Sequence, residues 1–347
     1  MKTSHKVVLG VISSMLAFGS QSALARDLTI VNFGGAAGAA QQTAFVEPLQ
    51  QQKNIKILNV PYNGELAKIK AMVDTNNVVW DVVEIETADL SRGCDEGLFE
   101  PLDWDNIIDK DALIPEAVHD CGMGVFVWST VMAYNGKTLD QTPNGWADFW
   151  DVEKFPGKRA LRKGARYNLE FALMADGVAP KDVYTVLNTP EGVDRAFNKL
   201  NELKPHIQWW EAGAQPLQML AAGDVVMSTV YNGRIAAANA EGQDLRIVWN
   251  GSIYDLDYYV IPMGSPNKAL AQEFISFSAQ PEQQIKHAQS INYGAINKAA
   301  IADLDEATLE QMPNSPQNAE HALLSSYDYW ADHGEELDQR FTAWSTQ

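Results

Sequence analysis

LTIVNFGG, residues 28–35, is an apolar run closed by two glycines, a pattern typical of a buried strand that ends in a tight turn. Further on, Leu66, Ile69 and Val73 recur at helical spacing, and Trp80–Ile85 is almost continuously apolar, as expected for a buried parallel strand. The predicted elements are, in order, strand Leu28–Phe33, helix Gln41–Gln52, strand Ile55–Val60, helix Glu65–Asp74 and strand Trp80–Ile85. This order predicts an α/β layer with right-handed crossovers.

The rest of the chain continues the alternation of strands and helices without a long flexible linker. Helices are predicted at Asp182–Leu187, Val193–Leu203, Leu270–Phe277, Glu282–Ala288 and Ala322–Trp344, and strands at Ile207–Trp210, Val225–Tyr231, Leu245–Trp249 and Tyr258–Ile261. A chain of 347 residues is long enough for two domains. Because no linker separates them, we expect two lobes that share strands and exchange segments.

The first 25 residues have the organisation of a secretory signal peptide. Lys2 and Lys6 give a positive start, Val7–Phe18 is a short apolar run, and Ala23-Leu24-Ala25 matches an A-x-A cleavage pattern. A membrane anchor is the alternative, but the run is well short of the ~20 apolar residues that a spanning helix needs. No cysteine follows the cleavage point to carry a lipid. We therefore expect cleavage after Ala25 and a soluble mature chain in the periplasm.

The charge of the chain argues against nucleic acid as a partner. The chain has 45 acidic and 26 basic residues, which give a formal net charge of −19. Nucleic-acid binding needs clustered Lys and Arg, and this composition disfavours it. A negative field suits an exported protein and modestly favours cationic small molecules, although solubility alone accounts for most of the charge.

The two cysteines, Cys94 and Cys121, are expected to form a disulfide, because export places them in an oxidising compartment. A pair of free buried thiols is the alternative. A metal site on both cysteines is less favoured, since His119 is the one histidine close to them in sequence and no tight ligand spacing occurs. The other histidines are scattered, so the sequence predicts neither a metal centre nor a cofactor.

Motifs of common catalytic sites are missing from the sequence. The chain has no G-x-S-x-G elbow, no H-E-x-x-H and no Walker loop. Gly34-Gly35-Ala36-Ala37-Gly38 follows a strand, but its spacing is not G-x-G-x-x-G. A tight strand-to-helix turn is one interpretation. The other is a helix start whose backbone N–H groups, that of Gly35 among them, face an anionic group of a ligand.

Seven segments, in order along nearly the whole mature chain, together resemble the periplasmic substrate-binding proteins of ABC importers, in the spermidine/putrescine-binding class. The segments are Val31–Gly35, Trp80–Glu84, Trp128–Asn135, Trp146–Trp150, Phe155–Arg159, Tyr231–Arg234 and Asp257–Pro262. Each motif alone is weakly specific. Their order behind a signal peptide carries the resemblance, which says more about the class of protein than about its ligand.

The resemblance implies an α/β fold of two lobes joined by crossing strands, a type II-like periplasmic binding protein, with the ligand in the cleft. Lobe 1 is expected to comprise residues 26–133 and about 258–300, and lobe 2 residues 134–257 and about 301–347. Binding would close the lobes by a hinge motion. The closed protein, a monomer and not an enzyme, would then deliver a small amine to a membrane permease whose ATPase is a separate chain.

Asp257 is the residue to which the resemblance assigns the ligand's amine. In polyamine binders of this family, a carboxylate that follows a Gly-rich turn and precedes an apolar strand to Pro takes a ligand ammonium, and the chemistry fits because an ammonium donates where a carboxylate accepts. The family usually has Trp two residues earlier, where this chain has Asp255. Asp255 and Asp257 share strand parity, so both are candidates to face the cleft. A solvated strand end is the alternative for either.

Arg234 is a second departure from the family pattern, which has a small residue after Asn-Gly. A guanidinium in the cleft would repel a polycation but can hold a carboxylate bidentately. Together with Asp257, Arg234 therefore suggests a zwitterion, such as the ω-amino acid 4-aminobutyrate. A structural Arg paired with a carboxylate of its own lobe is the alternative, and a polyamine such as putrescine or spermidine remains a candidate ligand.

Aromatic side chains are expected to supply the rest of the affinity. Each charge-assisted bond nets ~1.5–3 kcal/mol, whereas micromolar binding requires about 8 kcal/mol, so apolar burial and cation–π contacts should fill the gap. The candidates are Tyr167, which falls where the family has a polar ligand contact, and Trp210, Tyr231, Tyr62 and Tyr293; core packing is the alternative for each. Glu86 ends the third predicted strand and is a second candidate for the ammonium.

Two other functions are compatible with parts of the sequence. The same fold could bind ferric ion or a phosphate-bearing compound, but the tempting pair Tyr258-Tyr259 should point to opposite faces of a strand. An exported hydrolase could use Asp255 and Asp257, whose side chains would be ~7 Å apart on one strand, within some glycosidase separations. No other feature of the sequence supports a hydrolase.

Overall fold

A computed structural model of the chain describes residues 26–139 and 141–346, so the predicted signal peptide lies outside the described residues. The strands are β1 (Leu28–Asn32), β2 (Ile57–Pro61), β3 (Val82–Glu86), β4 (Val118–His119), β5 (Gly122–Asn135), β6 (Arg159–Arg162), β7 (Ile207–Trp210), β8 (Met227–Tyr231), β9 (Leu245–Val260) and β10 (Leu323–Leu324). The helices are α1 (Gly35–Gln41), α2 (Glu47–Lys53), α3 (Leu66–Asp74), α4 (Thr87–Asp95), α5 (Trp146–Trp150), α6 (Asn168–Ala175), α7 (Val183–Leu187), α8 (Pro190–Leu203), α9 (Gln215–Ala222), α10 (Asn232–Ala240), α11 (Lys268–Ser278), α12 (Pro281–Ile291), α13 (Lys298–Asp303), α14 (Glu306–Leu309), α15 (Pro316–Ala319) and α16 (Tyr327–Ser345).

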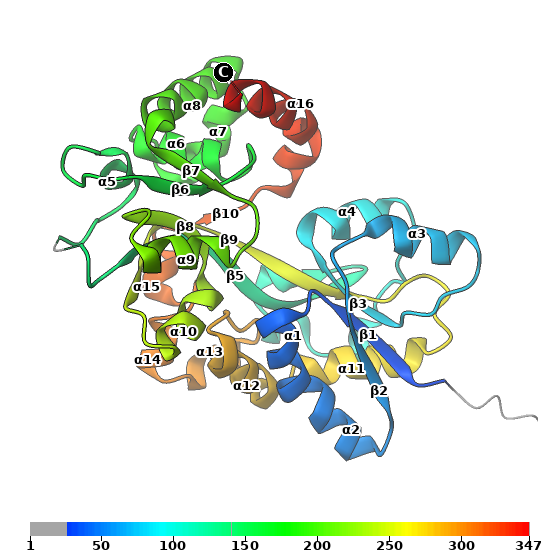
Figure 1. The fold of residues 1–347 in the computed structure, drawn as a ribbon. Coiled ribbons are helices and arrows are strands. Elements are labelled where there is room, and N and C mark those ends of the chain that lie inside the picture. The colour runs from blue at the N-terminus through cyan, green and yellow to red at the C-terminus, as the bar shows by residue number, and fades with distance from the viewer. Residues whose placement is uncertain (1–25, 140, 347) are drawn as a thin grey trace, which may run out of the picture.

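The strands form one mixed sheet that runs through two lobes (Figure 1). Its order is β2-β1-β3-β9-β5-β8-β6-β7, with β4 paired to β5 and β10 to β9. Pairing is parallel among β2, β1 and β3 at one end and among β8, β6 and β7 at the other. The pairs β3–β9, β9–β5 and β5–β8 between them are antiparallel, and the short β10 pairs with β9 in parallel. Two parallel α/β units joined by crossing strands are therefore present, as the sequence predicted.

The turn after β1 shows why this segment needs glycine. All five residues of β1 are buried, and the chain then turns through Gly34 at φ +67° and Gly35 at φ +59°. A Cβ on Gly34 would lie 3.0 Å from Cβ of Pro61, and one on Gly38 would lie 2.7 Å from Oδ1 of Asn32. Larger residues would be strained at the turn and crowded beside the strands. The turn therefore brings the start of α1 close against β1 and β2.

A single helical stretch follows the turn and is longer than the predicted helix Gln41–Gln52. It comprises α1, a π-helical segment η1 (Gln42–Val46) and α2, and it ends at Asn54, whose left-handed conformation (φ 52°) closes α2. The predicted helix Glu65–Asp74 and the strands near residues 57 and 82 are present within two residues of their predicted limits.

Two predictions from local sequence differ from the structure: one pair of strands is joined, and the last helix is confirmed from Tyr327 onward but not over its first five residues. The segments Leu245–Trp249 and Tyr258–Ile261 are one continuous strand of 16 residues, β9, because β5 pairs along its length. The register shifts between Thr130 and Met132 of β5, which pair with Ile253 and Val248 of β9. The shift accommodates the intervening residues of β9, including Gly251, without ending the strand. The predicted helix Ala322–Trp344 is instead the short strand β10 followed by α16, which begins at Tyr327 after Ser326 accepts a capping bond from the Tyr329 N–H.

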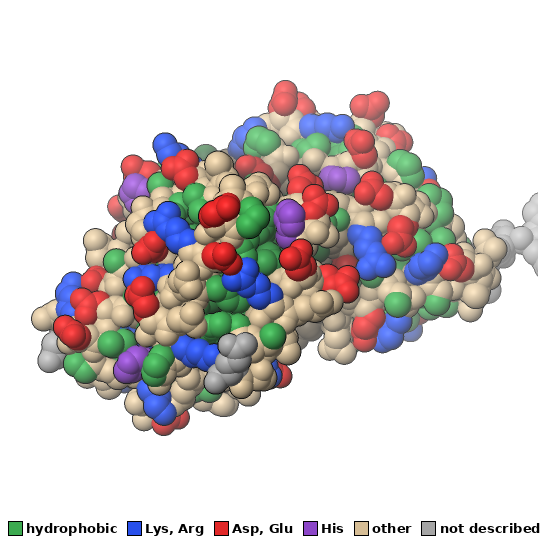
Figure 2. Space-filling view, turned by 90° about the horizontal axis from the view of Figure 1, so that it is seen from above, with side chains coloured by type: hydrophobic (Ala, Val, Ile, Leu, Met, Phe, Trp, Pro, Cys, Tyr) green, Lys and Arg blue, Asp and Glu red, His purple; other side chains and the backbone are tan. Residues whose placement is uncertain are grey.

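The crossing strand β5 is buried along its whole length: all 14 of its residues are buried, whereas β9 has exposed residues in its first half. Helices α3 and α4 lie on one side of β1–β3, while α2 and α11 lie on the other (Figure 1). Figure 2 shows acidic and basic side chains interspersed on one face of the molecule, without a continuous basic surface there.

No helix among the described residues combines the length and apolarity that crossing a membrane requires.

A disulfide joins Cys94 of α4 to Cys121 in the turn before β5, which confirms the predicted pairing. The two Cα atoms are 6.2 Å apart, within the usual range for a disulfide. Among the described residues, the His, Cys and carboxylate groups close enough together to hold a metal ion are Cys94, His119 and Cys121, and the disulfide uses both sulfurs. The bridge therefore serves to tie α4 to the crossing strand.

Breaking this bridge should lower stability without changing the fold. The cysteines are 27 residues apart, and closing a loop of this size restricts the unfolded chain by about 3 kcal/mol. We expect the Cys94→Ala/Cys121→Ala variant to lose about that much free energy of unfolding in urea. Adding a reductant should shift the unfolding midpoint of the wild type and leave that of the variant unchanged. Equal midpoints for wild type and variant would contradict this account.

Candidate functional site

A cavity of about 170 Å³ opens where β3, β9 and β5 lie side by side. Its remaining walls come from the turn after β1, the start of α10 and the segment after α12. The lining residues are Phe33, Gly34, Ala36, Ala37, Glu84, Glu86, Phe126, Trp128, Tyr231, Arg234, Asp257, Ile291 and Tyr293. A cavity of this size is below the range typical of drug-sized ligands, so it suits a small solute.

Strand parity places three carboxyl groups on one face of the sheet. Glu84 and Glu86 are two residues apart on β3, so they project to the same side. Glu86 lies directly opposite Asp257 of β9, and Glu84 lies diagonal to it. On the other side of β9, Phe126 of β5 is the register partner of Asp257. The carboxyl groups and the aromatic wall therefore meet at neighbouring positions of three strands.

Asp257 is buried at the base of the cavity. One of its oxygens, Oδ1, accepts a hydrogen bond from Nε1 of Trp128 at 2.9 Å. Burial raises the pKa of Asp257 well above its ordinary value, and the negative charges of Glu84 and Glu86 raise it further. A cationic group would relieve both effects, because it would replace the lost hydration and offset the neighbouring charges.

Glu84 is fully buried beside Asp257. Its Oε2 accepts hydrogen bonds from Nε2 of Gln41 at 2.9 Å and from the Phe33 N–H at 3.3 Å. Gln41 is itself held by the Tyr259 hydroxyl, which donates to its Oε1 at 2.7 Å. Burial raises the pKa of Glu84. The orientation of this carboxyl is therefore set by partners on β1, α1 and β9.

Arg234 brings positive charge to the same cavity from the first turn of α10. Its side chain is exposed, and within residues 26–139 and 141–346 it forms no ion pair. The predicted alternative, a structural Arg paired with a carboxylate of its lobe, therefore has no partner in the described part of the chain. The cavity presents acidic groups on β3 and β9 and a guanidinium on α10.

Aromatic rings form much of the remaining wall. Tyr231 meets Trp128 edge to face, with ring centroids 5.5 Å apart, and Tyr293 stacks on Phe126 at 4.9 Å. Tyr231 and Tyr293 were predicted as site residues, and both line the cavity together with Asp257, Arg234 and Glu86.

Four other predicted residues support the cavity without lining it. Trp210 packs edge to face against Tyr231 at 5.7 Å, and Tyr167 meets Trp128 in the same way at 6.3 Å. The Tyr62 hydroxyl donates to the backbone carbonyl of Glu84. Gly35 lies in the turn whose neighbouring residues Gly34 and Ala36 line the cavity.

Asp255 shares the strand face of Asp257 but has a different environment. Its Oδ2 accepts from Nη2 of Arg166 at 2.9 Å, and its Oδ1 accepts from the Thr87 hydroxyl at 2.5 Å and the Leu256 N–H at 2.9 Å. Burial raises the pKa of Asp255 to about 6 although Arg166 acts to lower it. The carboxyl is occupied by these partners and does not line the cavity.

The tyrosines considered as iron ligands are engaged elsewhere. The Tyr258 hydroxyl donates to the backbone carbonyl of Glu116 at 2.7 Å, whereas that of Tyr259 donates to Gln41 at 2.7 Å. The two hydroxyl groups therefore have separate partners and do not converge.

Sequence reasoning missed Glu84, Trp128, Phe126 and Phe33 as lining residues. For Glu84 a signal was available, because it shares strand parity with Glu86. Trp128 occurs in one of the segments that resemble the binding-protein family, but its role depends on pairing with β9 across more than a hundred residues of chain. That pairing is invisible to local periodicity.

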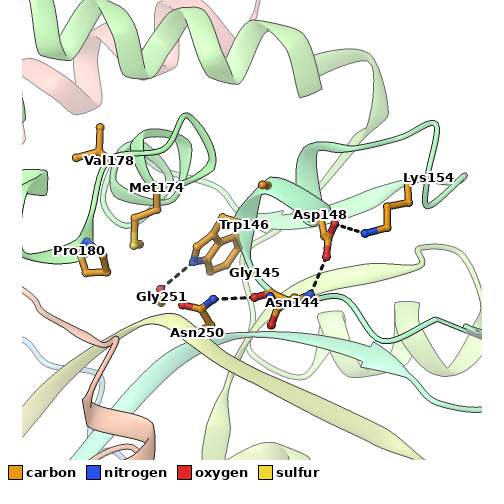
Figure 3. A pocket seen from close by; sticks show the side chains of 11 residues that line it. Asn144, Gly145, Trp146, Asp148, Lys154, Met174, Val178, Pro180, Asn250 and Gly251 are labelled. Atoms are coloured by element: carbon orange, nitrogen blue, oxygen red, sulfur yellow. Dashed lines mark hydrogen bonds and ion pairs between the residues drawn. The ribbon is translucent and has the colours of Figure 1, made fainter.

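A second concavity, of about 420 Å³, lies on the other lobe near α5 (Figure 3). Its polar groups are satisfied among themselves: Nε1 of Trp146 donates to the Gly251 carbonyl at 2.8 Å, and Nδ2 of Asn250 donates to the Asn144 carbonyl at 2.7 Å. Asp148 pairs with Lys154 at 2.7 Å. The charges of this concavity are thus already compensated, in contrast to those of the first cavity.

Comparison with known proteins was made with this geometry in hand. A family model described as bacterial extracellular solute-binding protein matches residues 44–318. A gamma-aminobutyric acid-binding protein of Pseudomonas aeruginosa is 53% identical over 333 residues, covering 96% of this chain and 95% of the relative. Among solved structures, the GABA receptor Atu4243 is 34% identical, with 92% and 98% of the two chains covered and a TM-score of 0.82. An ABC transporter substrate-binding protein from Bradyrhizobium japonicum is 37% identical, with 92% and 99% covered and a TM-score of 0.85.

Asp255 and Asp257 should respond oppositely to removal of their charge. Asp255→Asn leaves Arg166 without its buried partner, so we expect a loss of about 3 kcal/mol in the free energy of unfolding. Asp257→Asn leaves no buried cation without a partner, so stability at pH 7 should be equal or higher. A raised pKa means that the folded state binds more protons, so ionisation of either acid costs stability as the pH rises above about 4, but in Asp255 the ion pair with Arg166 offsets this cost. Urea unfolding of both ligand-free variants measures the difference. Equal losses in the two would show that Asp257 is a structural charge as well.

Proposed function

Since the chain belongs to the bacterial extracellular solute-binding protein family, we propose that its solute is a ω-amino acid, 4-aminobutyrate, which it carries to an ABC permease. Membership of the family supports a solute-binding role rather than an enzymatic one. The similarity to proteins described as binding gamma-aminobutyric acid supports the choice of solute.

The observation that carries this proposal is the pairing of opposite charges in one small cavity. Asp257 and Glu86 offer acceptors to an ammonium, whereas Arg234, which has no ion-pair partner among the described residues, offers a bidentate donor to a carboxylate. A zwitterion with an amine at one end and a carboxylate at the other satisfies both. A diamine would leave Arg234 unpaired and would place a second ammonium near it.

The cavity walls provide the rest of the affinity. Two charge-assisted contacts net about 3–6 kcal/mol together, short of the roughly 8 kcal/mol of a micromolar complex. Trp128, Tyr231 and Tyr293 place aromatic rings around Asp257, where an ammonium can take cation–π contacts and a short methylene chain can be buried. We propose that Tyr167, Trp210 and Tyr62 act by holding these walls.

The lobes close on the solute in this proposal. Glu84 and Phe33 approach the cavity from the side of β1 and β3, whereas Tyr231 and Arg234 approach from the side of β8 and α10. A solute that binds both sets favours the closed arrangement, with β5 and β9 as the hinge. The proposed lobes are residues 26–133 with about 258–300, and residues 134–257 with about 301–347.

Cellular location and partners complete the proposal. The pattern of residues 1–25 supports export to the periplasm with cleavage after Ala25, and family membership supports hand-over of the solute to an inner-membrane permease with its own ATPase. The receptor acts as a monomer. A polyamine is the second candidate solute, favoured by the three carboxyl groups of the cavity.

Replacing Arg234 should separate the two candidate solutes. In Arg234→Ala the solute carboxylate loses its charged partner, so we expect 4-aminobutyrate to bind about 30–100-fold more weakly, the equivalent of about 2–3 kcal/mol. Isothermal titration calorimetry with 4-aminobutyrate and putrescine measures both affinities.

Arg246→Ala is the matched control. Arg246 is another exposed arginine of the same lobe, but it pairs with Asp244 and lies outside the cavity, so its removal should leave binding unchanged. Undiminished 4-aminobutyrate binding by Arg234→Ala would contradict the proposal that Arg234 binds the carboxylate of the solute. Tight putrescine binding by the wild type, without 4-aminobutyrate binding, would favour the polyamine.

A further inference from the structure

Glu84 and Asp257 form a buried pair of carboxyl groups that no cation separates. The solvent-exposed fractions of Glu84 and Asp257 are 0% and 6%, and the two acids occupy diagonal positions of neighbouring strands and line the same cavity. An ionised carboxylate can only accept hydrogen bonds, so a bond between two carboxyl groups requires a proton on one of them. Two ionised carboxylates at these positions would repel each other without a hydrogen bond, whereas one shared proton would join them.

The partners of each oxygen indicate where this proton lies. Oε2 of Glu84 is used by Gln41 and the Phe33 N–H, and Oδ1 of Asp257 is used by Trp128. Oε1 of Glu84 is buried and has no hydrogen-bond partner among the described residues. A proton between Oε1 and Asp257 accounts for this otherwise orphaned oxygen.

The charged and titratable groups that face the pair do not remove the need for a proton. They are Glu86 on β3, Tyr62 after β2, Tyr259 on β9, Tyr293 after α12 and Arg234 on α10. Tyr258 lies on the opposite face of β9, where its hydroxyl donates to the Glu116 carbonyl. Burial raises the pKa of the three tyrosines that face the pair, so they stay neutral. Glu86 adds negative charge, and Arg234 is exposed and forms no ion pair or hydrogen bond with either acid among the described residues.

We propose that Glu84 and Asp257 share one proton in the empty cavity and that the ammonium of the solute displaces it. The proton leaves for solvent as the solute binds, while the ammonium keeps its own three protons and donates to the carboxylates. Glu84 is thereby a positioning residue: by sharing the proton it determines how readily Asp257 becomes an ionised acceptor for the ammonium. The displacement of the proton by the solute rests on the proposed function. The shared proton in the empty cavity is independent of which solute binds.

The exchange makes capture of the solute dependent on pH. Because the empty cavity binds one proton more than the filled cavity, affinity rises with pH, by up to about tenfold per pH unit while the pair is fully protonated. Glu84→Gln retains a donor toward Asp257 and an acceptor for Gln41 but cannot titrate. Its affinity should therefore change little between pH 6 and pH 8.5.

Proton release on binding is the direct test. The wild type is titrated with 4-aminobutyrate at pH 7 in buffers that differ in ionisation enthalpy, which yields the number of protons released per solute bound. We expect about one for the wild type and close to zero for Glu84→Gln. Glu86→Gln is the matched control: it lies two residues along the same strand and faces the same cavity, so it should bind more weakly yet still release a proton.

A measurement on the empty protein separates the two proposals. The infrared difference spectrum between wild type and Glu84→Gln at pH 7, without solute, should contain the C=O band of a protonated carboxyl, and Asp257→Asn should lose the same band. This band together with no binding of 4-aminobutyrate would reject the proposed solute and support the shared proton. Binding without proton release, or absence of the band, would overturn the inference.

Discussion

The pairing of two long antiparallel strands, β5 and β9, is the constraint on which the rest of the structure depends. They run through both lobes and carry the residues that form the base of the cavity. Their register sets Phe126 opposite Asp257 and Trp128 opposite Asp255. A slip of one residue would turn both carboxylates to the other face of the sheet. The proposed hinge and the proposed binding residues therefore belong to the same pair of strands, so a change in one would affect the other.

Two acids on one strand illustrate how environment separates structural from functional charge. Asp255 has a guanidinium, a hydroxyl and a backbone N–H around it, so its burial is compensated within the protein. Asp257 has one indole donor and an acidic neighbour, so its burial is left incompletely compensated. A buried carboxyl of this kind in a cavity is a candidate binding group, because a ligand can supply the missing partner.

Local sequence was sufficient for elements whose periodicity is complete within a few residues. The strands near Leu28, Ile57 and Val82 and the helix at Leu66–Asp74 follow directly from their apolar spacing. It failed at β9, where Asn250-Gly251 has the composition of a turn and a distant strand holds the chain extended. Asp257, Arg234 and Glu86 could be named from the sequence through its resemblance to the binding-protein family. The strand parity of Glu84 with Glu86 was a further signal. Trp128 could not be named, since it reaches Asp257 only through strand pairing.

The place of β9 in the chain has a consequence for the order of folding. Residues 245–260 lie between β3 and β5 in the sheet, so neither lobe can complete its hydrogen-bond ladder before about three quarters of the polypeptide is available. Contacts of such long sequence separation form slowly, because the entropy of loop closure must be overcome first. This topology suits the proposed export of the chain in an unfolded state, because it delays folding until most of the polypeptide has been synthesised.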